Sequence, residues 1–299
     1  MKEILNYKKI VKIEPIDIGL SKDKKYFIES IDRERFLLRI ADISKYKRHE
    51  NEYERMKHMD RHNIPMSRPV DFGICNDGKN VYQLLTWCEG ENLGTLFKLQ
   101  EDEQYKIGLL AGKILRKIHS VPIVETDITT ENWNERFSSF IDKSIDDFGK
   151  SGVTIESANL LLDYFSDNRY LLKTRHQCYI HGDYNIGNLI ISSGGDLSVI
   201  DWEIQLFNSY GDSWKELLMQ ATPKYSTGMI HGYFNGEPSE DFWHILAVYT
   251  SIDALSAVTW AYYRFPEYLD SKIEKCAEVI QWYDNMKNII PKWYLENNK

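Results

Sequence analysis

The pattern of apolar residues changes near residue 90, and this change constrains the fold more than any other feature of the chain. Before it, short β-type runs alternate with turn-like or charged segments. After it, apolar residues recur every three or four positions, as in helices that bury one face. The sequence therefore predicts an α+β protein with a small, antiparallel β-rich N-terminal lobe and a larger, mostly helical C-terminal lobe.

Individual elements follow from the same periodicities. Asn76-Asp77-Gly78 predicts a tight hairpin turn, because such turns need positive φ angles. The elements predicted for the first part are strands over 10–18, 25–31, 35–40, 72–75 and 81–87, and a helix over 46–61. Those predicted for the second part are helices over 107–118, 157–165 and most of 240–290. We place the lobes at 1–88 and 89–299, with a hinge near 84–90.

Length and composition bound the class of protein. At 299 residues, 42% of them hydrophobic, the chain can bury a sizeable core. No long apolar run follows Met1, and the apolar stretch 242–265 carries Asp253, which favours a buried helix over a membrane span. The four cysteines are scattered without framework spacing, so a reduced, cytoplasmic protein is expected.

Charge is unevenly distributed. Residues 1–122 hold 23 Lys and Arg against 19 Asp and Glu, and residues 123–299 hold 14 against 26. An acidic C-terminal part argues against a nucleic-acid partner. The asymmetry suits a protein that holds phosphates with its first part and a cation with its second, and it equally suits a solvated acidic surface.

The segment 179–203 carries the most chemical information. Two apolar runs separated by Gly194-Gly195 predict a hairpin with a two-residue loop. That register places Asn188 directly opposite Asp201, so that the two side chains could share one cation. A carboxamide with a carboxylate suits Mg²⁺, which binds through one or two carboxylates plus substrate phosphates.

Asp183 lies five residues before Asn188, in the loop that leads into this hairpin. A carboxylate at that place can face a metal-bound phosphate and accept a hydrogen bond from an incoming hydroxyl, as phosphoryl transfer requires. The alternative is a polar turn at 181–183 with Asp201 as a strand-end cap. The joint presence of Asp183, Asn188 and Asp201 favours the functional interpretation.

With these residues the chain resembles the aminoglycoside phosphotransferase family, relatives of protein kinases that also include choline-type and other small-molecule kinases. The resemblance rests on His181-Gly182-Asp183-x-x-x-x-Asn188 and Ile200-Asp201-Trp202-Glu203, with Leu115-x-x-Ile118-His119-Ser120 in support. It extends from Gly19 to about Trp260, and the segment 211–234 is similar to kanamycin-type kinases. It implies a bilobal protein-kinase-like fold whose first lobe binds the nucleotide.

The resemblance also implies roles for particular residues. Asp183 would orient the acceptor hydroxyl as catalytic base, and Asn188 and Asp201 would hold Mg²⁺ with ATP or GTP. Arg39 would contact the α- and β-phosphates with Glu52 as its helix partner, although Glu50 and Glu54 are close alternatives. The residues implied to support the catalytic loop are His181 and Asp212.

Two features depart from the protein-kinase pattern. Arg39 stands where protein kinases use Lys, yet its permanent charge and fork of donors suit phosphate. The loop at Gly19 lacks G-x-G-x-x-G, so Ser21 and backbone N–H groups are expected to meet the phosphates there. Lys22, Lys24 and Lys25 are interpreted as a solvated turn.

The resemblance further implies a hinge whose backbone pairs with the nucleotide base, at Leu85, Thr86, Trp87 and Cys88. It implies an acidic acceptor site in the second lobe. The candidate acceptor-binding residues are Glu203, Glu237, Glu240, Asp241 and Asp253. Asp253 is favoured among the later ones, because a charge inside an apolar helix is costly unless it has a partner.

These inferences predict a Mg²⁺-dependent phosphotransferase that moves the γ-phosphate of ATP or GTP to a hydroxyl of a small, cationic acceptor such as an aminoglycoside. A metabolite kinase for choline, a thio-sugar or an amino acid is the alternative with the same mechanism. A pseudokinase without turnover is an alternative of another class. A zinc hydrolase is disfavoured, because the histidines lack ligand spacing.

Overall fold

The computed structural model describes residue 4 and residues 7–17, 23–127, 133–172, 177–208 and 222–298. Contacts divide the chain into two compact units. The first comprises Met1–Gly94 and Gly187–Ile204, and the second comprises Thr95–Ile186 and Gln205–Lys299. The segment 187–204 thus packs with the N-terminal part of the chain, which a single boundary at residue 88 does not capture. The assignment of nucleotide and acceptor binding to separate lobes stays a prediction.

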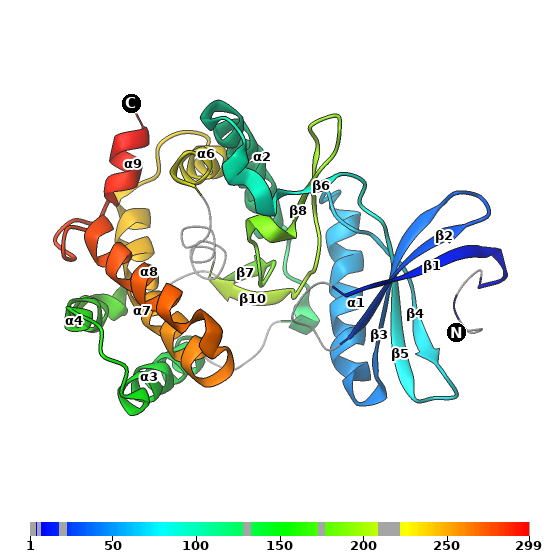
Figure 1. The fold of residues 1–299 in the computed structure, drawn as a ribbon, viewed down its shortest axis with the longest axis horizontal. Coiled ribbons are helices and arrows are strands. Elements are labelled where there is room, and N and C mark those ends of the chain that lie inside the picture. Colours follow the sequence, from blue (N-terminus) through cyan, green and yellow to red (C-terminus); the bar gives the residue numbers. More distant parts are fainter. Residues whose placement is uncertain are drawn as a thin grey trace. The chain divides into compact units, whose positions relative to one another are not determined.

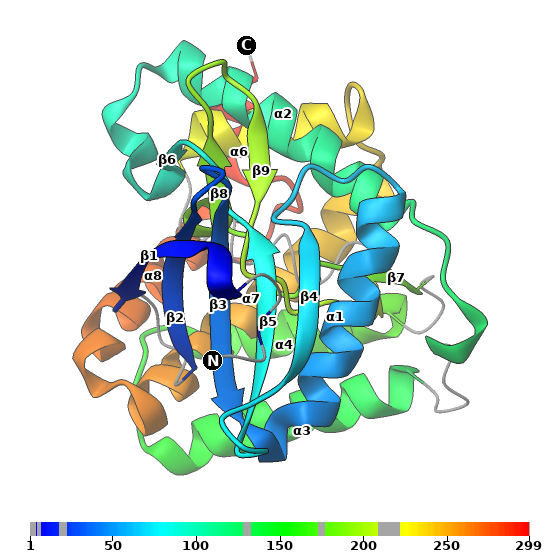
Figure 2. The same ribbon diagram turned by 90° about the vertical axis from the view of Figure 1, so that its right-hand side faces the viewer.

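A five-stranded antiparallel sheet forms most of the first unit (Figure 2). Its strand order is β1-β2-β3-β5-β4, and its strands are β1 Ile10–Ile16, β2 Lys24–Ser30, β3 Arg35–Asp42, β4 Pro69–Cys75 and β5 Asn80–Thr86. Helix α1, Tyr46–Arg61, lies along one face of this sheet. The helix predicted over 46–61 is confirmed, and so is the hairpin turn, because Asn76, Asp77 and Gly78 all have positive φ.

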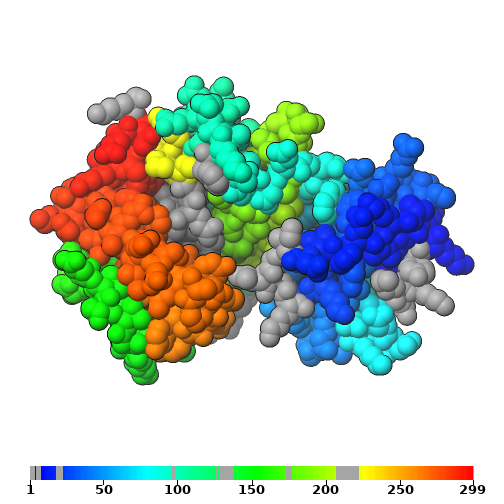
Figure 3. All heavy atoms as spheres, in the orientation of Figure 1, coloured from blue at the N-terminus to red at the C-terminus, as the bar shows by residue number. Residues whose placement is uncertain are grey.

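A hydrophobic core covers the face of this sheet opposite α1, because its residues on β3 and β5 alternate with Arg39 and Gln83, which contact α1. Ile28, Leu38 and Leu84 are at most 4% exposed and pack in one cluster. β1, by contrast, is an edge strand with Val11 61% exposed, and its atoms lie at the surface in the space-filling view (Figure 3). The central strands β3 and β5 are therefore the rigid part of the unit, on which functional side chains can be held.

The hairpin of β8 (Leu189–Ile191) and β9 (Leu197–Val199) corrects the predicted register. Leu189 pairs with Val199, and the backbone N–H of Ile200 donates to the carbonyl of Asn188 at 3.0 Å. Asn188 therefore lies opposite Ile200, and Asp201 follows one residue later. The reason is that the loop has three residues rather than two: Ser192 pairs with Asp196, and Gly195 takes the positive φ.

The same hairpin joins the first unit through two sets of contacts. β8 pairs with β6 (Glu91–Asn92), and a Cβ on Gly90 would lie 2.1 Å from the carbonyl oxygen of Ile191, so the approach requires glycine. β9 is bonded through Val199 to Pro65 and Ser67, at 2.9 and 3.1 Å. These bonds position residues 200–204 beside the sheet.

The second unit is mostly helical (Figure 1). Its described helices of six residues or more are α2 Glu101–His119, α3 Trp133–Ser151, α4 Ala158–Asn168, α6 Pro223–Phe234, α7 Glu240–Arg264, α8 Leu269–Trp282 and α9 Lys292–Asn297. β7 (Gln177–Ile180) and β10 (Gln205–Asn208) form a small antiparallel sheet. The predicted fold class, a small antiparallel β part with a larger helical part, is confirmed.

Helices α2 and α6 cross at very short distance. Gly108 and Gly112 on α2 face Gly228 and Gly232 on α6, and a Cβ at any of the four would lie 2.0–2.2 Å from a backbone oxygen of the partner helix. Spacing of small residues by four places them on one face, which lets two helix backbones approach closely. This crossing fixes α2, on which the loop after β7 rests.

Helix α7 passes through the centre of the helical packing. It is the one described helix long and apolar enough to cross a membrane, and 72% of its most apolar window is buried inside the protein. Its residues Ala254, Leu255 and Val258 pack with α4 and α8. A core helix accounts for its composition, as the sequence predicts.

Candidate active site

Arg39 is the central cation of the first unit. β3 places its side chain against α1, where its Nη1 donates to Glu52 Oε1 at 3.0 Å. The two side chains are 10% and 8% exposed. A buried, charge-assisted pair of this kind fixes the guanidinium in one orientation. The structure thus brings Arg39 to Glu52, and Glu50 instead pairs with Lys47 on the surface.

Asp201 lies next to this pair. Its Oδ1 is 3.7 Å from Arg39 Nη1 and its Oδ2 is 3.3 Å from Lys25 Nζ. The Asp201 backbone has φ of 57°, a left-handed conformation that is uncommon for a residue with a Cβ. The Nη1 of Arg55 donates to the carbonyl of Ile204 at 2.8 Å and holds the segment that follows. Such strain persists where the surroundings impose it, and it is enriched at functional sites.

Lys25 differs from its predicted role. It lies in strand β2 rather than in a turn, and its side chain is 13% exposed. The interpretation as a solvated turn is therefore wrong for Lys25, because the strand begins at Lys24 and turns the Lys25 side chain toward Asp201. Lys24 is exposed, as expected, and Lys22 lies outside the described residues.

A buried carboxylate that the sequence prediction missed completes this cluster. Asp23 is 5% exposed and lies 2.5 Å from Lys45 Nζ, 3.3 Å from His49 Nε2 and 3.7 Å from Arg39 Nη2. Burial alone would raise the pKa of Asp23, but the hydrogen bond from Lys45 and the positive charges nearby outweigh it and lower that pKa. The pairing of strands β2 and β3 could have revealed this cluster, because it places Lys25 directly opposite Arg39.

The loop that carries Asp183 belongs to the second unit, between β7 and the short helix η6 (Ile186–Asn188). The backbone N–H of Asp183 donates to Nδ1 of the fully buried His181 at 3.2 Å. The Nδ2 of Asn185 donates to Asp183 Oδ1 at 2.9 Å. The hydroxyl of buried Tyr184 donates to the Ala111 carbonyl on α2 at 2.8 Å. These bonds hold the loop of Asp183 in place, and the supporting role of His181 stays a prediction.

Asn188 and Glu203 lie on the 187–204 segment of the first unit. Asn188 ends η6 immediately before β8, and the neighbouring Gly187 carbonyl accepts a 2.5 Å hydrogen bond from Asn92. The Glu203 side chain is 53% exposed and lies 3.3 Å from Arg48. This surface ion pair makes a weak contribution to stability, so Glu203 can exchange its partner.

The predicted hinge begins with the last two residues of β5. Leu85 is buried, and the amides of Thr86 and Trp87 already donate to the carbonyls of Arg68 and Arg35 at 2.9 and 3.0 Å. Burial raises the pKa of the Cys88 thiol to about 11. A base that pairs with this backbone must therefore use groups other than the Thr86 and Trp87 amides.

The acceptor candidates of the second unit are not gathered in one place by any described contact. Glu237 accepts hydrogen bonds from Tyr294 at 2.6 Å and Asn298 at 2.8 Å, which lower its pKa and tie α9 to the end of α6. Asp241 is exposed in the first turn of α7, and Asp253 is half-buried in the same helix. Glu240 is exposed beside Asp241. Gly19, Ser21 and Asp212 lie outside the described residues.

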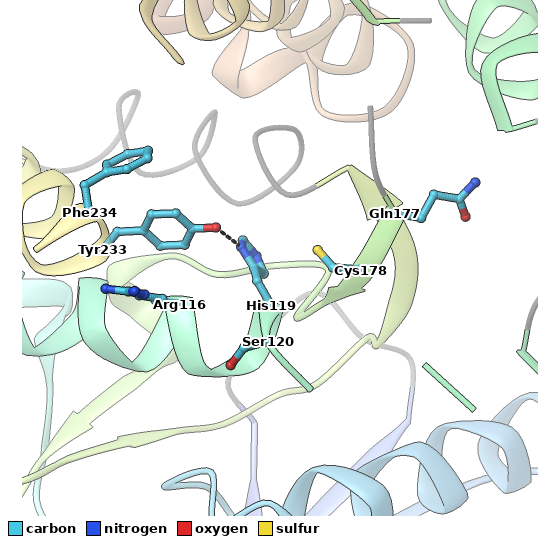
Figure 4. A pocket seen from close by; sticks show the side chains of 7 residues that line it. All are labelled: Arg116, His119, Ser120, Gln177, Cys178, Tyr233 and Phe234. Atoms are coloured by element: carbon cyan, nitrogen blue, oxygen red, sulfur yellow. Dashed lines mark hydrogen bonds between the residues drawn. The ribbon is translucent and has the colours of Figure 1, made fainter. Parts of the chain in front are cut away.

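A cavity of about 390 Å³ lies elsewhere in the second unit (Figure 4). Its lining includes the last turn of α2, β7 and the end of α6, and it includes none of the predicted site residues that the structure describes. Nδ1 of His119 is 2.8 Å from the Tyr233 hydroxyl, and burial lowers the pKa of His119 to about 3. His119, part of the motif that supports the resemblance, thus joins α2 to α6.

The Asp201 carboxylate is an oxygen ligand of the kind that Mg²⁺ prefers. No three His, Cys, Asp or Glu side chains among the described residues are grouped to cage a metal. Mg²⁺ needs no such cage, because it uses one or two protein oxygens together with phosphates and water. The Asp201 carboxylate already attracts two cationic side chains, as a metal ligand would be expected to do.

A family model described as "Phosphotransferase enzyme family" matches residues 12–205, about two thirds of the chain. The chain belongs to this phosphotransferase family. It is accordingly a small-molecule kinase that acts on a hydroxyl group, and the predicted family is confirmed. A comparison with curated protein sequences finds no match.

Several solved kinase and phosphotransferase structures share the fold. An amicoumacin kinase in complex with AMP-PNP and Ca²⁺ has TM-score 0.64 and 10% identity, over 97% of this chain and 92% of that one. The GDP complex of aminoglycoside 2'-phosphotransferase-IIIa has TM-score 0.67 and 15% identity, over 90% and 92%. A choline/ethanolamine kinase family protein from Mesorhizobium loti has TM-score 0.66 and 14% identity, over 93% and 91%.

Proposed function

We propose that the chain transfers the γ-phosphoryl group of ATP or GTP, with Mg²⁺, to a hydroxyl of a small cationic acceptor of the aminoglycoside type. One observation carries this proposal: Asp201, strained at φ 57°, lies within 4 Å of two cationic side chains, one of which is fixed by the buried Glu52. A cation-rich site with one available carboxylate suits a metal-bound triphosphate.

In the proposed reaction, the acceptor hydroxyl oxygen forms a bond to the γ-phosphorus, and the bond from that phosphorus to the β,γ-bridging oxygen breaks. The hydroxyl proton passes to the Asp183 carboxylate, and the nucleoside diphosphate leaves. Asn185 and His181 hold the loop so that this carboxylate is positioned before the acceptor binds. Mg²⁺, held by Asp201 and Asn188, would supply positive charge to the phosphate oxygens.

The acceptor class rests on charge. The C-terminal part carries the excess of carboxylates, and Glu203, Asp241 and Asp253 are the candidates to meet a cation. Glu237 is a weaker candidate because Tyr294 and Asn298 already occupy both of its oxygens. Solved structures with a similar fold include an aminoglycoside phosphotransferase and a choline/ethanolamine kinase family protein. Their names support both an aminoglycoside and a choline-type acceptor as candidates.

A coupled nucleotide-turnover assay tests the proposal. The protein is assayed in Mg²⁺ with ATP and with GTP against aminoglycosides, choline and small amino-sugars. Turnover that depends on an aminoglycoside is the expected result. Turnover with choline or another metabolite alone would favour the metabolite-kinase alternative.

Two variants assign the turnover to the site. Asp183→Ala and Asp201→Ala should each abolish phosphoryl transfer, while far-UV circular dichroism stays that of wild type. Wild-type turnover in either variant would show that the site is assigned wrongly. Nucleotide binding without turnover across the whole panel would favour a pseudokinase.

A further inference from the structure

Lys25 and Arg39 are direct cross-strand neighbours. The register of β2 with β3 pairs Lys25 with Arg39. Paired residues of antiparallel strands project their side chains to the same face of the sheet, about 5 Å apart at Cβ. Both cationic side chains therefore point from the same face of the sheet toward the segment that carries Asp201.

Each of the two cations lies close to a different oxygen of the Asp201 carboxylate. Lys25 Nζ lies 3.3 Å from Oδ2, and Arg39 Nη1 lies 3.7 Å from Oδ1. The Lys25 side chain is 13% exposed and that of Asp201 is 38% exposed, so water reaches this pair mainly from the Asp201 side. Asp201 is thus a carboxylate whose two oxygens both face positive charge.

The two cations differ in how firmly they are held. Arg39 is within 4 Å of Asp23 and Glu52 as well, both of which are buried, and its own side chain is 10% exposed. Among the described residues, the Lys25 ammonium has Asp201 as its one ion-pair partner. A lysine carries its charge on a flexible four-carbon stem, whereas the guanidinium of Arg39 is fixed as a fork. Lys25 is the cation that can move.

We propose that Lys25 is a second phosphate-binding residue of the nucleotide site. Its ammonium pairs with Asp201 until the metal–nucleotide complex binds. The inference rests on the proposed function. Like charges at about 3–4 Å repel, so a divalent cation bound to Asp201 weakens the attraction between that carboxylate and the Lys25 ammonium. Lys25 therefore leaves Asp201 when a metal binds there, and the phosphates that arrive with the metal are its new partner.

Charge within the cluster supports the exchange. Asp23, Glu52 and Asp201 face Arg39, Lys25 and Lys45, so the carboxylates and the Lys and Arg cations of the cluster are equal in number. A divalent cation alone would leave excess positive charge beside Lys25. The metal with a triphosphate brings net negative charge instead, which the released ammonium neutralises.

Two binding measurements on the full chain test the inference. Lys25→Met keeps the length of the side chain and removes its charge. Lys24→Met, at the exposed neighbour on the same strand, is the matched control, and Lys25→Arg restores the charge. Fluorescent ATP and ADP analogues are titrated in Mg²⁺, and Mn²⁺ is titrated without nucleotide and followed by electron paramagnetic resonance.

The expected results have opposite signs. Lys25→Met should weaken binding of the ATP analogue about 10-fold, which corresponds to about 1.4 kcal/mol, because one phosphate contact is lost. The same variant should bind Mn²⁺ several-fold more tightly, because Asp201 no longer carries an ammonium. Lys25→Arg should recover most of the ATP affinity, and Lys24→Met should match wild type in both titrations.

The failures are distinguishable. If wild type binds the nucleotide analogues and Lys25→Met binds them equally well, the role of Lys25 is refuted while the proposed function stands. If Lys25→Met loses nucleotide and Mn²⁺ affinity together with a lowered midpoint of thermal unfolding, Lys25 is a structural ion pair. If wild type binds no nucleotide in Mg²⁺, the proposed function and this inference fail together.

Discussion

At the scale of single residues, the site depends on carboxylates that share cations. Arg39 lies within 4 Å of Asp23, Glu52 and Asp201, three residues from different parts of the chain. Buried charges of this kind are tolerated only when each has a partner, because desolvation is costly. Replacing Arg39 by an apolar residue would leave the buried Glu52 without its main cation and would remove one of the cations near Asp23, so its role in binding cannot be separated from its role in stability.

His119 gives the stability a dependence on pH. Burial lowers its folded-state pKa to about 3, from an ordinary 6.5. The unfolded chain therefore takes up a proton at this residue between pH 6.5 and 3 that the folded chain does not, and the free energy of unfolding falls as the pH drops through that window. Above pH 6.5 the contribution is constant. We expect the loss to be roughly 2 kcal/mol at pH 5 relative to pH 7.

Urea unfolding of wild type and His119→Asn at pH 5, 6 and 7 measures this contribution. Asn cannot titrate but can still hydrogen-bond Tyr233, so the stability difference between the two proteins should shrink or reverse toward pH 5. His244→Asn, at a side chain that is 40% exposed, controls for the general loss of a histidine. A difference that stays constant from pH 7 to pH 5 would contradict the prediction.

A motif fixes the spacing of Asp183, Asn188 and Asp201 along the chain, and the roles assigned to them stay predictions. Residue roles could not be predicted where the fold brings distant residues together. Asp23 and Lys25 read locally as parts of a charged turn, and their partners Lys45, His49 and Asp201 are set by strand pairing and by the packing of α1. Glu237 likewise reads as a free surface acid until α9 returns to it.

At the scale of elements, the α2–α6 crossing is the tightest contact of the second unit. Its four glycines make backbone-to-backbone contact in place of side-chain packing. Such contact holds two helices at a fixed distance, and Tyr184 then ties the loop of Asp183 to the Ala111 carbonyl on α2. The position of that loop therefore depends on an element pair remote from it in sequence.

Gly112→Ala should destabilise the protein by about 3 kcal/mol or more, because the new Cβ would lie 2.0 Å from the Met229 carbonyl oxygen and force the helices apart. Gly149→Ala in α3 is the matched control. A Cβ there meets nothing within 4 Å, so the better helix propensity of Ala should stabilise by about 0.5–1 kcal/mol. Urea denaturation gives both values, and a Gly112→Ala variant as stable as wild type would show that the crossing can relax.

Elements with a clear period were predictable, and their pairing was less so. The helix over 46–61 and the strands on either side of Asn76-Asp77-Gly78 follow from local pattern alone. The β8–β9 register does not follow from local pattern, because Gly194-Gly195 permits both a two-residue loop and a three-residue loop with Gly195 in the left-handed region. The Ser192 hydroxyl, which accepts hydrogen bonds from the Gly194 and Asp196 amides, favours the longer loop.

At the scale of the whole molecule, the first unit is built from two separated stretches of chain. Residues 187–204 supply β8, β9 and the buried Trp202 to a unit whose other part ends at Gly94. Sequence periodicity cannot reveal such a return, because it reports the character of each segment and not its neighbours. The change of apolar pattern near residue 90 predicts two parts, whereas the discontinuity of the first unit required the contacts of Val199 with Pro65 and Ser67.

A single-chain version of the first unit should fold by itself when both stretches are present. Asn92 Nδ2 lies 2.5 Å from the Gly187 carbonyl, so a short Gly/Ser linker can join residue 94 to residue 187. We expect this fused chain to unfold cooperatively in urea. The fragment 1–94 alone should not, because β6 loses its partner strand and Val199 no longer bonds to Pro65 and Ser67. Equal cooperativity in the two chains, followed by circular dichroism, would contradict this assignment.

The half-buried Cys88 thiol at the predicted hinge has a consequence for inhibitor chemistry. With a pKa of about 11, the Cys88 thiol is ionised in only about one molecule in several thousand near neutral pH. Its hydrogen bond with Ser198 does not reverse the effect of burial. Acrylamides and chloroacetamides react with thiolates, so compounds that carry such warheads toward this hinge would label the protein slowly. Reversible ligands that use shape and backbone hydrogen bonds are the better starting point for blocking the site.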